Sequence, residues 1–458
     1  MATFTIEELN KALNGALIQK GVTSLFSGIS TDTRTIKKGD VFIALLGENF
    51  DGHEFIDNAI NKGAAGIIIS NKNCLHKVPK QISIFYVNDT KVALENCAYF
   101  HRNRFLIPVI GVTGSNGKTT TKDMIFTILN QVFSVCSTVK NNNNEIGMCQ
   151  TLLSLKKSDN VCIVEMGMRG IGQIKELCTF TKPTIGVVTN VGTSHIGILG
   201  SKRNIAKAKS ELIESLGETG IAVLNQDDPL VIGMQENFRG KVLTYGIKKG
   251  DVHAENISYG ITSTSFDCHI KEHVFSIELP VLGVHNVYNA LASIAVGYLM
   301  GVETSYIQRA FQQYKPAEQR QHIVNMYGVQ IMDDSYNANP LSMEMAFQAL
   351  KQLNGVHQIL VLGDMLELGE KEKTYHYETG KRAAEIGVDT VITVGELGKF
   401  IALGAKEHGC KQVISCNTLE EAAQVLESIM KKGDTVLLKA SHSMHMEKIL
   451  QLLGGDGK

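Results

Sequence analysis

Residues 107–123, IPVIGVTGSNGKTTTKD, constrain the fold of this chain more than any other segment. An apolar run enters a glycine-rich turn, and a helical pattern opens at about Lys118. In this context backbone N–H groups can surround phosphate oxygens, a lysine can reach the β- and γ-phosphates, and a hydroxyl can hold Mg²⁺. Gly114, Gly117, Lys118 and Thr119 supply these parts. The plainer alternative is an ordinary strand-to-helix turn with a capping threonine.

Strand-like runs and helical patterns alternate along most of the chain, which predicts an α/β fold. The chain has 458 residues, and a single core stops growing at roughly 250 to 300 residues, so we expect several domains. We predict a small α/β domain at 1–90, a central P-loop domain with a parallel sheet at 91–313, and a C-terminal Rossmann-like, doubly wound domain at 314–458.

The pattern also predicts individual elements. Central strands are expected at 109–112, 161–165, 185–189 and 221–224, with a β excursion at 253–279. C-terminal strands are expected at 330–332, 358–362, 390–394 and 435–439, and they alternate with helices at 342–353, 377–386 and 419–430.

Charge and cysteine content exclude several classes of protein. The 45 Lys and Arg residues nearly balance the 46 Asp and Glu residues, so no global field attracts nucleic acid or an anionic membrane. The apolar stretch 290–302 is well short of the roughly 20 residues that span a bilayer. No secretory signal is apparent, so we expect a cytoplasmic protein. The nine scattered cysteines include no CxxC pair and are expected to be free thiols.

Several segments together carry a resemblance to a known family. The loop T-G-S-N-G-K-T, followed by further threonines, resembles that of the Mur ligases and their folylpolyglutamate synthetase relatives. VCIVEMGMRG (161–170), TNVGTSHIGILGS (189–201) and NIAKAKSELIE (204–214) follow the order of this family's second-metal and carbamate residues. HNVYNALA (285–292) resembles its adenine-binding helix.

Three other segments resemble one branch of the family in particular. They are STDTRTIKKGDVFIALLGENFDGHEFI (30–56), DDSYNANPLSM (333–343) and LGDMLELG (362–369). The first resembles the UDP-sugar domain of that branch, so the resemblance covers essentially the whole chain. The chain departs from the family pattern at 440–445, and the roles of those residues stay open.

The resemblance implies an ATP-dependent carboxylate–amine ligase that uses Mg²⁺. The γ-phosphoryl of ATP would pass to the terminal carboxylate of a UDP-N-acetylmuramoyl-tripeptide, and the amine of D-alanyl-D-alanine would attack the acyl phosphate to form a pentapeptide for peptidoglycan. We expect a monomer that binds these small molecules without nucleic acid or membrane insertion. Whether the third residue of the tripeptide is lysine or a diaminoacid stays open.

The resemblance also implies roles for individual residues. The expected catalytic residues are Lys118, Glu165, His195 and Lys209, the last as a carbamate, and the expected metal ligands are Thr119, Glu165, His195 and Lys209. The expected ATP contacts are Thr113, Gly114, Ser115, Asn116, Gly117, Lys118, Thr119, Thr120, Asn286, Asn289, Arg320 and Asp334. The expected substrate contacts are Thr31, Asp32, Thr33, Arg34, Asn142, Asn143, Tyr336, Asn337 and Asn339.

Several of these residues also have a plainer interpretation. Glu165 could be a solvated strand end, His195 a polar loop histidine and Lys209 a surface lysine. Because Glu165 ends one predicted strand and His195 follows the next, we expect them at adjacent strand ends. Local caps or turns are the plainer interpretation for the polar groups at 31–34, 141–144, 286 and 337–340.

Two other functions remain as alternatives. The chain could be a ligase of the same fold that adds an amino acid to a murein precursor or glutamate to folate, although YNANP (336–340) argues against it. It could also be a P-loop switch that hydrolyses nucleotide to change partners, which would not need a third doubly wound domain.

Overall fold

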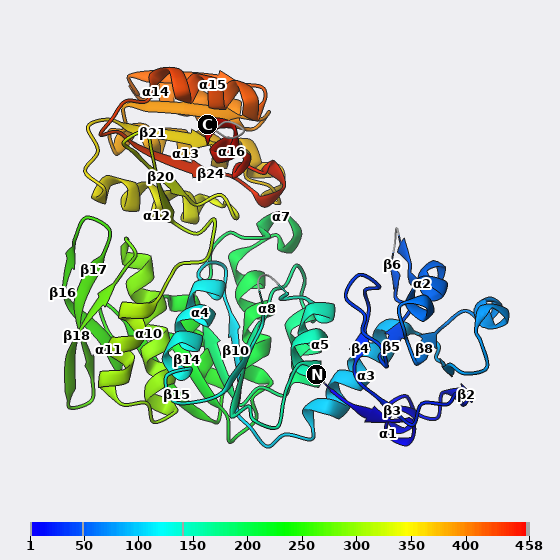
Figure 1. The fold of residues 1–458 in the computed structure, drawn as a ribbon. Coiled ribbons are helices and arrows are strands. Elements are labelled where there is room, and N and C mark those ends of the chain that lie inside the picture. The colour runs from blue at the N-terminus through cyan, green and yellow to red at the C-terminus, as the bar shows by residue number, and fades with distance from the viewer. Residues whose placement is uncertain (1, 48–49, 140–141, 455–458) are drawn as a thin grey trace. The chain divides into compact units, whose positions relative to one another are not determined.

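The computed structural model describes residues 2–47, 50–139 and 142–454 (Figure 1). The chain forms two compact units. The first comprises Met1–Gly111, Val132–Gly167 and Ile174–Ile185, and the second comprises Val112–Gln131, Met168–Gln173 and Gly186–Lys458. Helices alternate with largely parallel sheets, which confirms the predicted α/β class. Among the described helices, none is long and apolar enough to cross a membrane.

The first unit opens with a five-stranded sheet in the order β2-β9-β8-β5-β4. These strands are Leu17–Gln19, Ser83–Tyr86, Gly66–Ile69, Val41–Ile43 and Ile29–Ser30. Only β2 is antiparallel to its neighbour. The accompanying helices are α1 (Ile6–Ala12), α2 (Ile56–Asn61) and α3 (Thr90–Arg102). The short strands β1 (Phe4–Thr5) and β3 (Leu25–Phe26) pair with each other, as do β6 (Leu46–Gly47) and β7 (Phe50–Asp51).

Local signals explain why the helices of this unit begin where they do. Thr5 and Glu8 form a capping box at the start of α1. The carboxylate of Asp89 accepts hydrogen bonds from the backbone N–H groups of Lys91 and Val92 and so begins α3. Apolar residues of α2, β5 and β8, among them Ile56, form one buried core beneath the sheet.

A nine-stranded sheet has the order β11-β12-β10-β13-β14-β15-β16-β17-β18. Its strands are Val135–Ser137, Val161–Glu165, Val109–Thr113, Ile185–Val188, Ile221–Asn225, Lys241–Gly246, Val252–Tyr259, Thr264–Ile270 and His273–Leu279. Every residue of β10, β12 and β13 is buried, as expected for parallel strands covered on both faces. The helices that accompany them are α4 (Lys118–Leu129), α5 (Glu145–Leu153), α6 (Gln173–Thr181), α7 (Ile196–Leu199), α8 (Lys202–Glu214), α9 (Pro229–Ile232), α10 (Val284–Leu299) and α11 (Thr304–Gln313).

The C-terminal part of the second unit contains a six-stranded sheet in the order β19-β20-β24-β21-β22-β23. Its strands are His322–Met326, Val329–Asp333, Thr435–Lys439, Gln358–Leu362, Thr390–Val394 and Gln412–Cys416, and its helices are α12 (Pro340–Gln352), α13 (Glu372–Glu385), α14 (Gly398–Glu407), α15 (Leu419–Ile429) and α16 (Lys448–Gly454). Along β21, Leu360 and Leu362 face the core formed with α12, α13 and α14, while Ile359 and Val361 face the core formed with α15 and α16. This two-sided burial is the doubly wound arrangement that the sequence predicts.

Most predicted elements are confirmed, and four strands match residue for residue: β12, β21, β22 and β24. The β excursion at 253–279 is the antiparallel meander β16-β17-β18. Among the elements that the sequence interpretation missed are the strands β11, β15, β19 and β23 and the helices α5, α6 and α14. All nine cysteines are free, as expected.

Candidate active site

The predicted phosphate loop joins β10 to α4 through two glycines with unusual backbone geometry. Gly117 caps α4 with φ +79°, and Gly114 has φ +154°. A Cβ atom at Gly117 would lie 2.3 Å from Asn289 Oδ1, and one at Gly114 would lie 1.8 Å from Thr189 Oγ1. Both positions therefore need glycine for dihedral and steric reasons. The strand, turn and helix that the sequence predicts here are confirmed.

Lys118 folds back over the loop that precedes it. Its Nζ donates to Gly114 O at 2.8 Å and to Ser115 O at 3.4 Å. These bonds place the ammonium group among backbone carbonyls at the start of α4. That position suits a cation that neutralises a bound phosphate.

The segment after β13 holds the loop in place. Asn190 O accepts from the Ser115 N–H, and Asn190 Oδ1 accepts from the Asn116 N–H. Thr189 Oγ1 donates to Asn116 O at 2.6 Å. Since His195 lies at the end of this same segment, the loop and the histidine are positioned together.

Asn286 and Asn289 occupy one face of α10, as their spacing predicts. Asn289 Nδ2 donates to Asn286 Oδ1 at 3.1 Å, and Asn289 Oδ1 accepts from Thr121 Oγ1 at 3.2 Å. Asn286 is not the N-cap of the helix, because Gly283 occupies that position. Instead, Asn286 Nδ2 donates to Leu282 O and to Gln321 Oε1, each at 2.8 Å.

Lys118, His195 and Lys209 lie within electrostatic reach of one another. Lys209 is only 2% exposed, so it is not the surface lysine of the plainer interpretation. Burial, and then the charge of Lys118, hold the pKa of Lys209 well below its ordinary value. Burial also lowers the pKa of His195, and the charges of Lys118 and Lys209 act in the same direction. The site thus disfavours protonation of Lys209 and His195.

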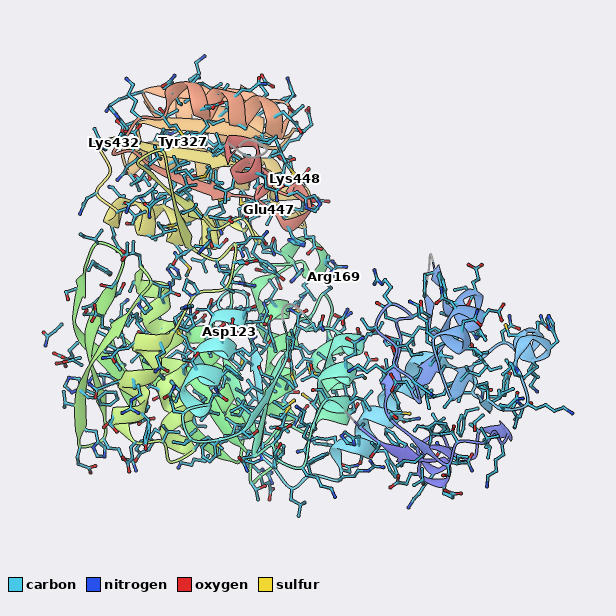
Figure 2. All side chains as sticks on the ribbon, viewed as in Figure 1. Asp123, Arg169, Tyr327, Lys432, Glu447 and Lys448 are labelled. Atoms are coloured by element: carbon cyan, nitrogen blue, oxygen red, sulfur yellow. The ribbon has the colours of Figure 1, made fainter. Side chains whose placement is uncertain are left out.

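His195 is oriented by a carboxylate that the sequence interpretation missed. Its Nδ1 lies 2.5 Å from Glu367 Oε2, and Arg169, labelled in Figure 2, lies 3.6 Å from Glu367 Oε1. A carboxylate on one ring nitrogen leaves the other, Nε2, as the atom that can bind a metal. Glu367 lies in the segment LGDMLELG (362–369), but nothing in that segment marks it as a partner of His195.

In the first unit, Glu165 ends β12 and is 1% exposed, which excludes the solvated strand end of the plainer interpretation. Its Oε1 accepts from Asn143 Nδ2 at 2.9 Å. Asn143, which was expected to contact substrate, holds this carboxylate in the structure. Asn142, the chain neighbour of Asn143, is partly exposed, whereas Asn141 lies outside the described residues.

The expectation that Glu165 and His195 lie at adjacent strand ends is wrong. In the strand order, β10 lies between β12 and β13. Alternating strands and helices along the sequence predict a parallel sheet. They do not predict the order of the strands within that sheet. Glu165 therefore ends one of the two strands that flank the phosphate-loop strand, and His195 follows the other.

Arg320 connects the phosphate loop to residues further along the chain. Its Nη2 donates to Thr119 Oγ1 at 2.9 Å, and its guanidinium carbon lies 3.9 Å from the centroid of the Tyr336 ring. Arg320 and Thr119, both expected to contact nucleotide, therefore lie next to Tyr336, which was expected to contact substrate. A guanidinium stacked on an aromatic ring is held in one orientation.

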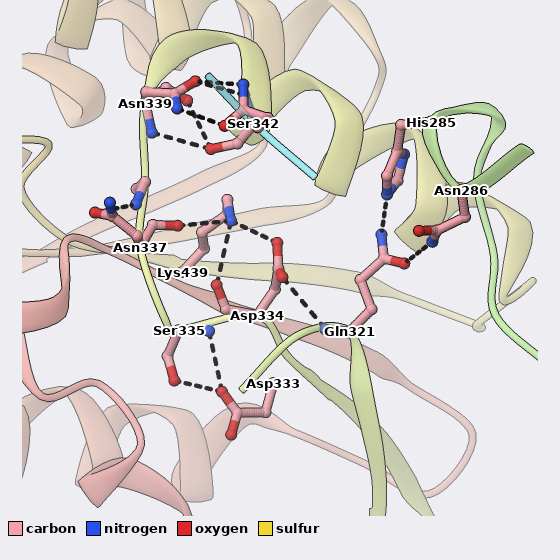
Figure 3. Close-up of polar contacts among 12 residues, drawn as sticks. His285, Asn286, Gln321, Asp333, Asp334, Ser335, Asn337, Asn339, Ser342 and Lys439 are labelled. Atoms are coloured by element: carbon pink, nitrogen blue, oxygen red, sulfur yellow. Dashed lines mark hydrogen bonds and ion pairs between the residues drawn. The ribbon is translucent and has the colours of Figure 1, made fainter. Parts of the chain in front are cut away.

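Figure 3 shows a polar network around Asp334 and the buried Lys439. Lys439 Nζ donates to Asp334 Oδ2 at 2.5 Å and to Asn337 O at 3.0 Å. Asp334 Oδ1 accepts from the Gln321 N–H at 3.2 Å. Asp334 is thus held in an ion pair. The Asn337 side chain accepts a hydrogen bond from the backbone N–H of Ala338, as a turn residue does.

Gln321 and Lys439 were not among the expected site residues. Gln321 Nε2 lies 3.0 Å from His285 Nε2, and burial lowers the pKa of His285 to about 4, so the neutral imidazole can accept this bond. The sequence does contain a signal for Lys439, because a lysine ends the buried and mainly apolar strand β24. No pattern marked Gln321.

Asn339 combines two roles. It is the N-cap of α12 and forms a capping box with Ser342, as the plainer interpretation requires. Its Nδ2 also donates to Asn116 Oδ1 at 2.7 Å and to Ser194 Oγ at 2.9 Å. The cap therefore reaches the phosphate loop and the segment that leads to His195.

The polar cluster at 31–34 forms a turn in the first unit. Arg34 Nη2 lies 2.7 Å from Asp32 Oδ2, and the Arg34 backbone N–H donates to Asp32 Oδ1. The arginine side chain is 86% exposed and could exchange this carboxylate for a diphosphate. Thr31 Oγ1 accepts from Gln150 Nε2 at 3.2 Å, and Thr33 lies in the same turn.

A strand-loop-helix phosphate site followed by a doubly wound region defines an ATP-binding α/β protein. Residues 25–110 match the Mur ligase family catalytic domain, 112–297 the Mur ligase middle domain, and 319–442 the Mur ligase glutamate ligase domain. The chain belongs to the Mur ligase family.

Relatives and solved structures agree with this assignment over the full length of the chain. It is 36% identical over 452 residues to a UDP-N-acetylmuramoyl-tripeptide–D-alanyl-D-alanine ligase of Bacillus subtilis, covering 98% of this chain and 97% of that protein. It resembles the crystal structure of MurF from Acinetobacter baumannii with a TM-score of 0.91 at 30% identity, covering 100% of both chains. MurF ligase from Thermotoga maritima in complex with ADP gives a TM-score of 0.83 at 30% identity, covering 93% of this chain and 96% of that one.

Proposed function

We propose that this chain joins D-alanyl-D-alanine to the terminal carboxylate of UDP-N-acetylmuramoyl-tripeptide, with ATP as the energy source and UDP-N-acetylmuramoyl-pentapeptide as the product. One observation carries the proposal: similarity to relatives named for this reaction extends over 98% of the chain. The phosphate loop and the buried Lys209 beside Lys118 are consistent with it.

The reaction needs charge neutralisation more than it needs covalent catalysis by the protein. A carboxylate is a poor electrophile until one oxygen is phosphorylated, and the amine then attacks the acyl phosphate and releases phosphate. Lys118 would stabilise the negative charge on the transferring phosphoryl group. Thr113, Ser115, Asn116 and Thr120 would complete the ATP contacts with the loop glycines, and Arg320 and Asp334 would approach the nucleotide from the C-terminal region.

Two of the three expected donors carry the oxygen atoms that Mg²⁺ prefers, and the third is an imidazole. Thr119 offers a hydroxyl oxygen, Glu165 a buried carboxylate and His195 an imidazole whose Nδ1 is already held by Glu367. Hard oxygen ligands are those that Mg²⁺ prefers. When bound, the ion would supply positive charge against the phosphates.

Lys209 would contribute as a carbamate. Its neutral amine attacks CO₂, forming an N–C bond and releasing a proton, so a buried cation becomes an anionic oxygen ligand. The lowered pKa of Lys209 supports this step, because only the neutral amine reacts.

We assign the three domains to 1–90, 91–313 and 314–458, for the UDP-sugar substrate, ATP and the closing ligase domain respectively. Thr31, Asp32, Thr33 and Arg34 would bind the UDP-sugar, and Tyr336, Asn337 and Asn339 would lie near the peptide. The enzyme would act in the cytoplasm. It would be a monomer, and light scattering on the purified chain would test this oligomeric state.

A substrate-dependence assay tests the proposal. ADP release should require ATP, Mg²⁺, UDP-N-acetylmuramoyl-tripeptide and D-alanyl-D-alanine together, and mass spectrometry should detect the pentapeptide. Parallel reactions with lysine and diaminopimelate tripeptides would identify the third residue. ADP release with a free amino acid or with folate and glutamate would favour another ligase, and release with ATP alone would favour a nucleotide switch.

A further inference from the structure

The outer face of the β16–β17 hairpin carries a cluster of metal-binding side chains away from the phosphate loop. His253 and His269 are direct cross-strand partners, and Glu255 is directly opposite Asp267. Because side chains alternate along a strand, these four residues project from one face. The intervening residues Ala254 and Cys268 are buried on the other face.

The two imidazoles and Glu255 converge. His269 Nε2 lies 3.4 Å from Glu255 Oε2, and His253 Nε2 lies 3.9 Å from Glu255 Oε1. The rings stack at 4.8 Å with an interplanar angle of 11°. One ligand atom from each of the three residues lies within 4.8 Å of the others. Around a tetrahedral ion with bonds of about 2.0 to 2.2 Å, ligand atoms are roughly 3.3 to 3.6 Å apart, so small side-chain rotations would close the cluster.

A neighbouring contact orients His253 for this role. Its Nδ1 lies 3.1 Å from Gly250 O, so Nδ1 carries the proton that this carbonyl accepts. Nε2 then presents its lone pair toward Glu255. Histidines that bind metals are commonly held in this way through the second ring nitrogen.

The local charge also favours a cation. Glu255 is directly opposite Asp267, and like charges at such a pair destabilise a sheet. Asn256 Nδ2 and Ser276 Oγ donate to the two carboxylate oxygens of Asp267 at 2.9 and 2.7 Å and hold this carboxylate in place. A cation bound near Glu255 would offset the negative charge of these two facing carboxylates.

We propose that His253, Glu255 and His269 form a binding site for Zn²⁺ or a similar divalent transition metal. Two imidazoles and one carboxylate suit this class of ion better than Mg²⁺, which prefers oxygen ligands. The partial exposure of the three residues leaves the fourth position to water. The ion would link β16 to β17, strands that α10 contacts.

Co²⁺ titration of the full-length protein tests this proposal, because ligand-field absorption reports on coordinated cobalt. The titration is run with excess Mg²⁺, and bound Co²⁺ is then displaced with Zn²⁺. His253→Gln and His269→Gln should each weaken binding at this site by at least about tenfold, relative to wild type. His273→Gln, which changes an exposed histidine on β18 outside the cluster, is the matched control and should bind as wild type does.

Hydrogen exchange locates the effect and guards against misfolded variants. Zn²⁺ should slow amide exchange in 252–259 and 264–270 of the wild type but not of His253→Gln. Metal-free variants should melt close to the metal-free wild type. Equal Co²⁺ affinity in wild type and both variants, or no protection of the hairpin by Zn²⁺, would overturn the proposal and leave an ordinary histidine–glutamate ion pair.

Discussion

Arg320 donates a hydrogen bond to Thr119 Oγ1 across 2.9 Å, although the two residues are 201 positions apart in the chain. The hydroxyl that we assign to Mg²⁺ therefore already has a cationic neighbour. Metal binding must share this oxygen or displace the guanidinium toward the phosphates. In either case we expect Arg320 to change its contacts when nucleotide binds.

Replacement of Arg320 tests this coupling. Arg320→Ala should raise the KM for ATP by about tenfold or more, because a charged hydrogen-bond donor is worth roughly 1.5 to 3 kcal/mol. Arg320→Lys should recover only part of the loss, since lysine keeps the charge but not the planar stack on Tyr336. Arg309→Ala, an exposed arginine on α11, is the control. An unchanged KM in Arg320→Ala would contradict the assignment.

Lys118→Ala should abolish ligation without unfolding the protein. Removal of one electrostatic donor of this kind typically costs about 10²-fold or more in turnover. The melting temperature should stay close to that of the wild type, because the loop glycines and α4 remain. Lys207→Ala, on the exposed side of α8, is the matched control. Retention of more than about a tenth of wild-type turnover would refute the phosphate-loop role.

Chemical rescue tests the carbamate at Lys209. Lys209→Ala should lose most activity, and acetate should restore part of it by occupying the vacated space with an oxygen anion. Lys209→Arg should stay inactive, because arginine keeps the positive charge that carbamylation removes. Steady-state rates measured with and without acetate decide the matter. A fully active Lys209→Arg enzyme would show that Lys209 is an ordinary cation.

The lowered pKa of Lys209 also predicts how stability depends on pH. Between its folded pKa and the ordinary value of about 10.4, the unfolded chain binds a proton that the folded chain does not, so this residue makes stability rise with pH. In CO₂-free buffer, Lys209→Met should therefore stabilise the protein at pH 7, and the gain should shrink toward pH 10. Denaturant unfolding at several pH values measures this difference. A gain independent of pH would mean that the lysine carries no ionisation penalty.

Glu367→Gln should act through His195 and not on the fold. Glu367 raises the pKa of His195 against the lowering effect of burial, so its neutralisation should shift the histidine limb of the kcat profile to lower pH. The Mg²⁺ concentration for half-maximal rate should rise about 10- to 100-fold, as is usual when a residue that orients a metal ligand is lost. Glu370→Gln, which changes an exposed residue on the short 3-10 helix Gly369–Lys371, is the control. An unaltered Mg²⁺ dependence would show that Glu367 does not position His195 for metal binding.

The elements that could be predicted are those whose burial produces a regular pattern of apolar residues in the sequence. β21 was predicted residue for residue because both of its faces are apolar, whereas the three-residue β11 and the half-exposed β23 carry no comparable pattern. The phosphate loop was predicted because its glycines, lysine and threonine have fixed spacing.

Partners that are distant in the sequence could not be predicted in the same way. The contact of Asn143 with Glu165 and that of Glu367 with His195 depend on strand order and on loops that no local pattern describes. Asn286 and Asn289 fall between these cases. Their shared face follows from helical spacing, but the bond from Asn286 to Gln321 does not.

The two glycines of the phosphate loop restrict how this protein could acquire resistance to an inhibitor. A side chain at position 117 would meet both the Asn289 amide and a left-handed backbone, and one at position 114 would meet the Thr189 hydroxyl. Trimming Asn289 would relieve the first clash but not the dihedral strain. A compound could bind only the main chain of this loop. Substitution of either glycine could not change that surface without damaging ATP binding, so resistance by this route would be costly.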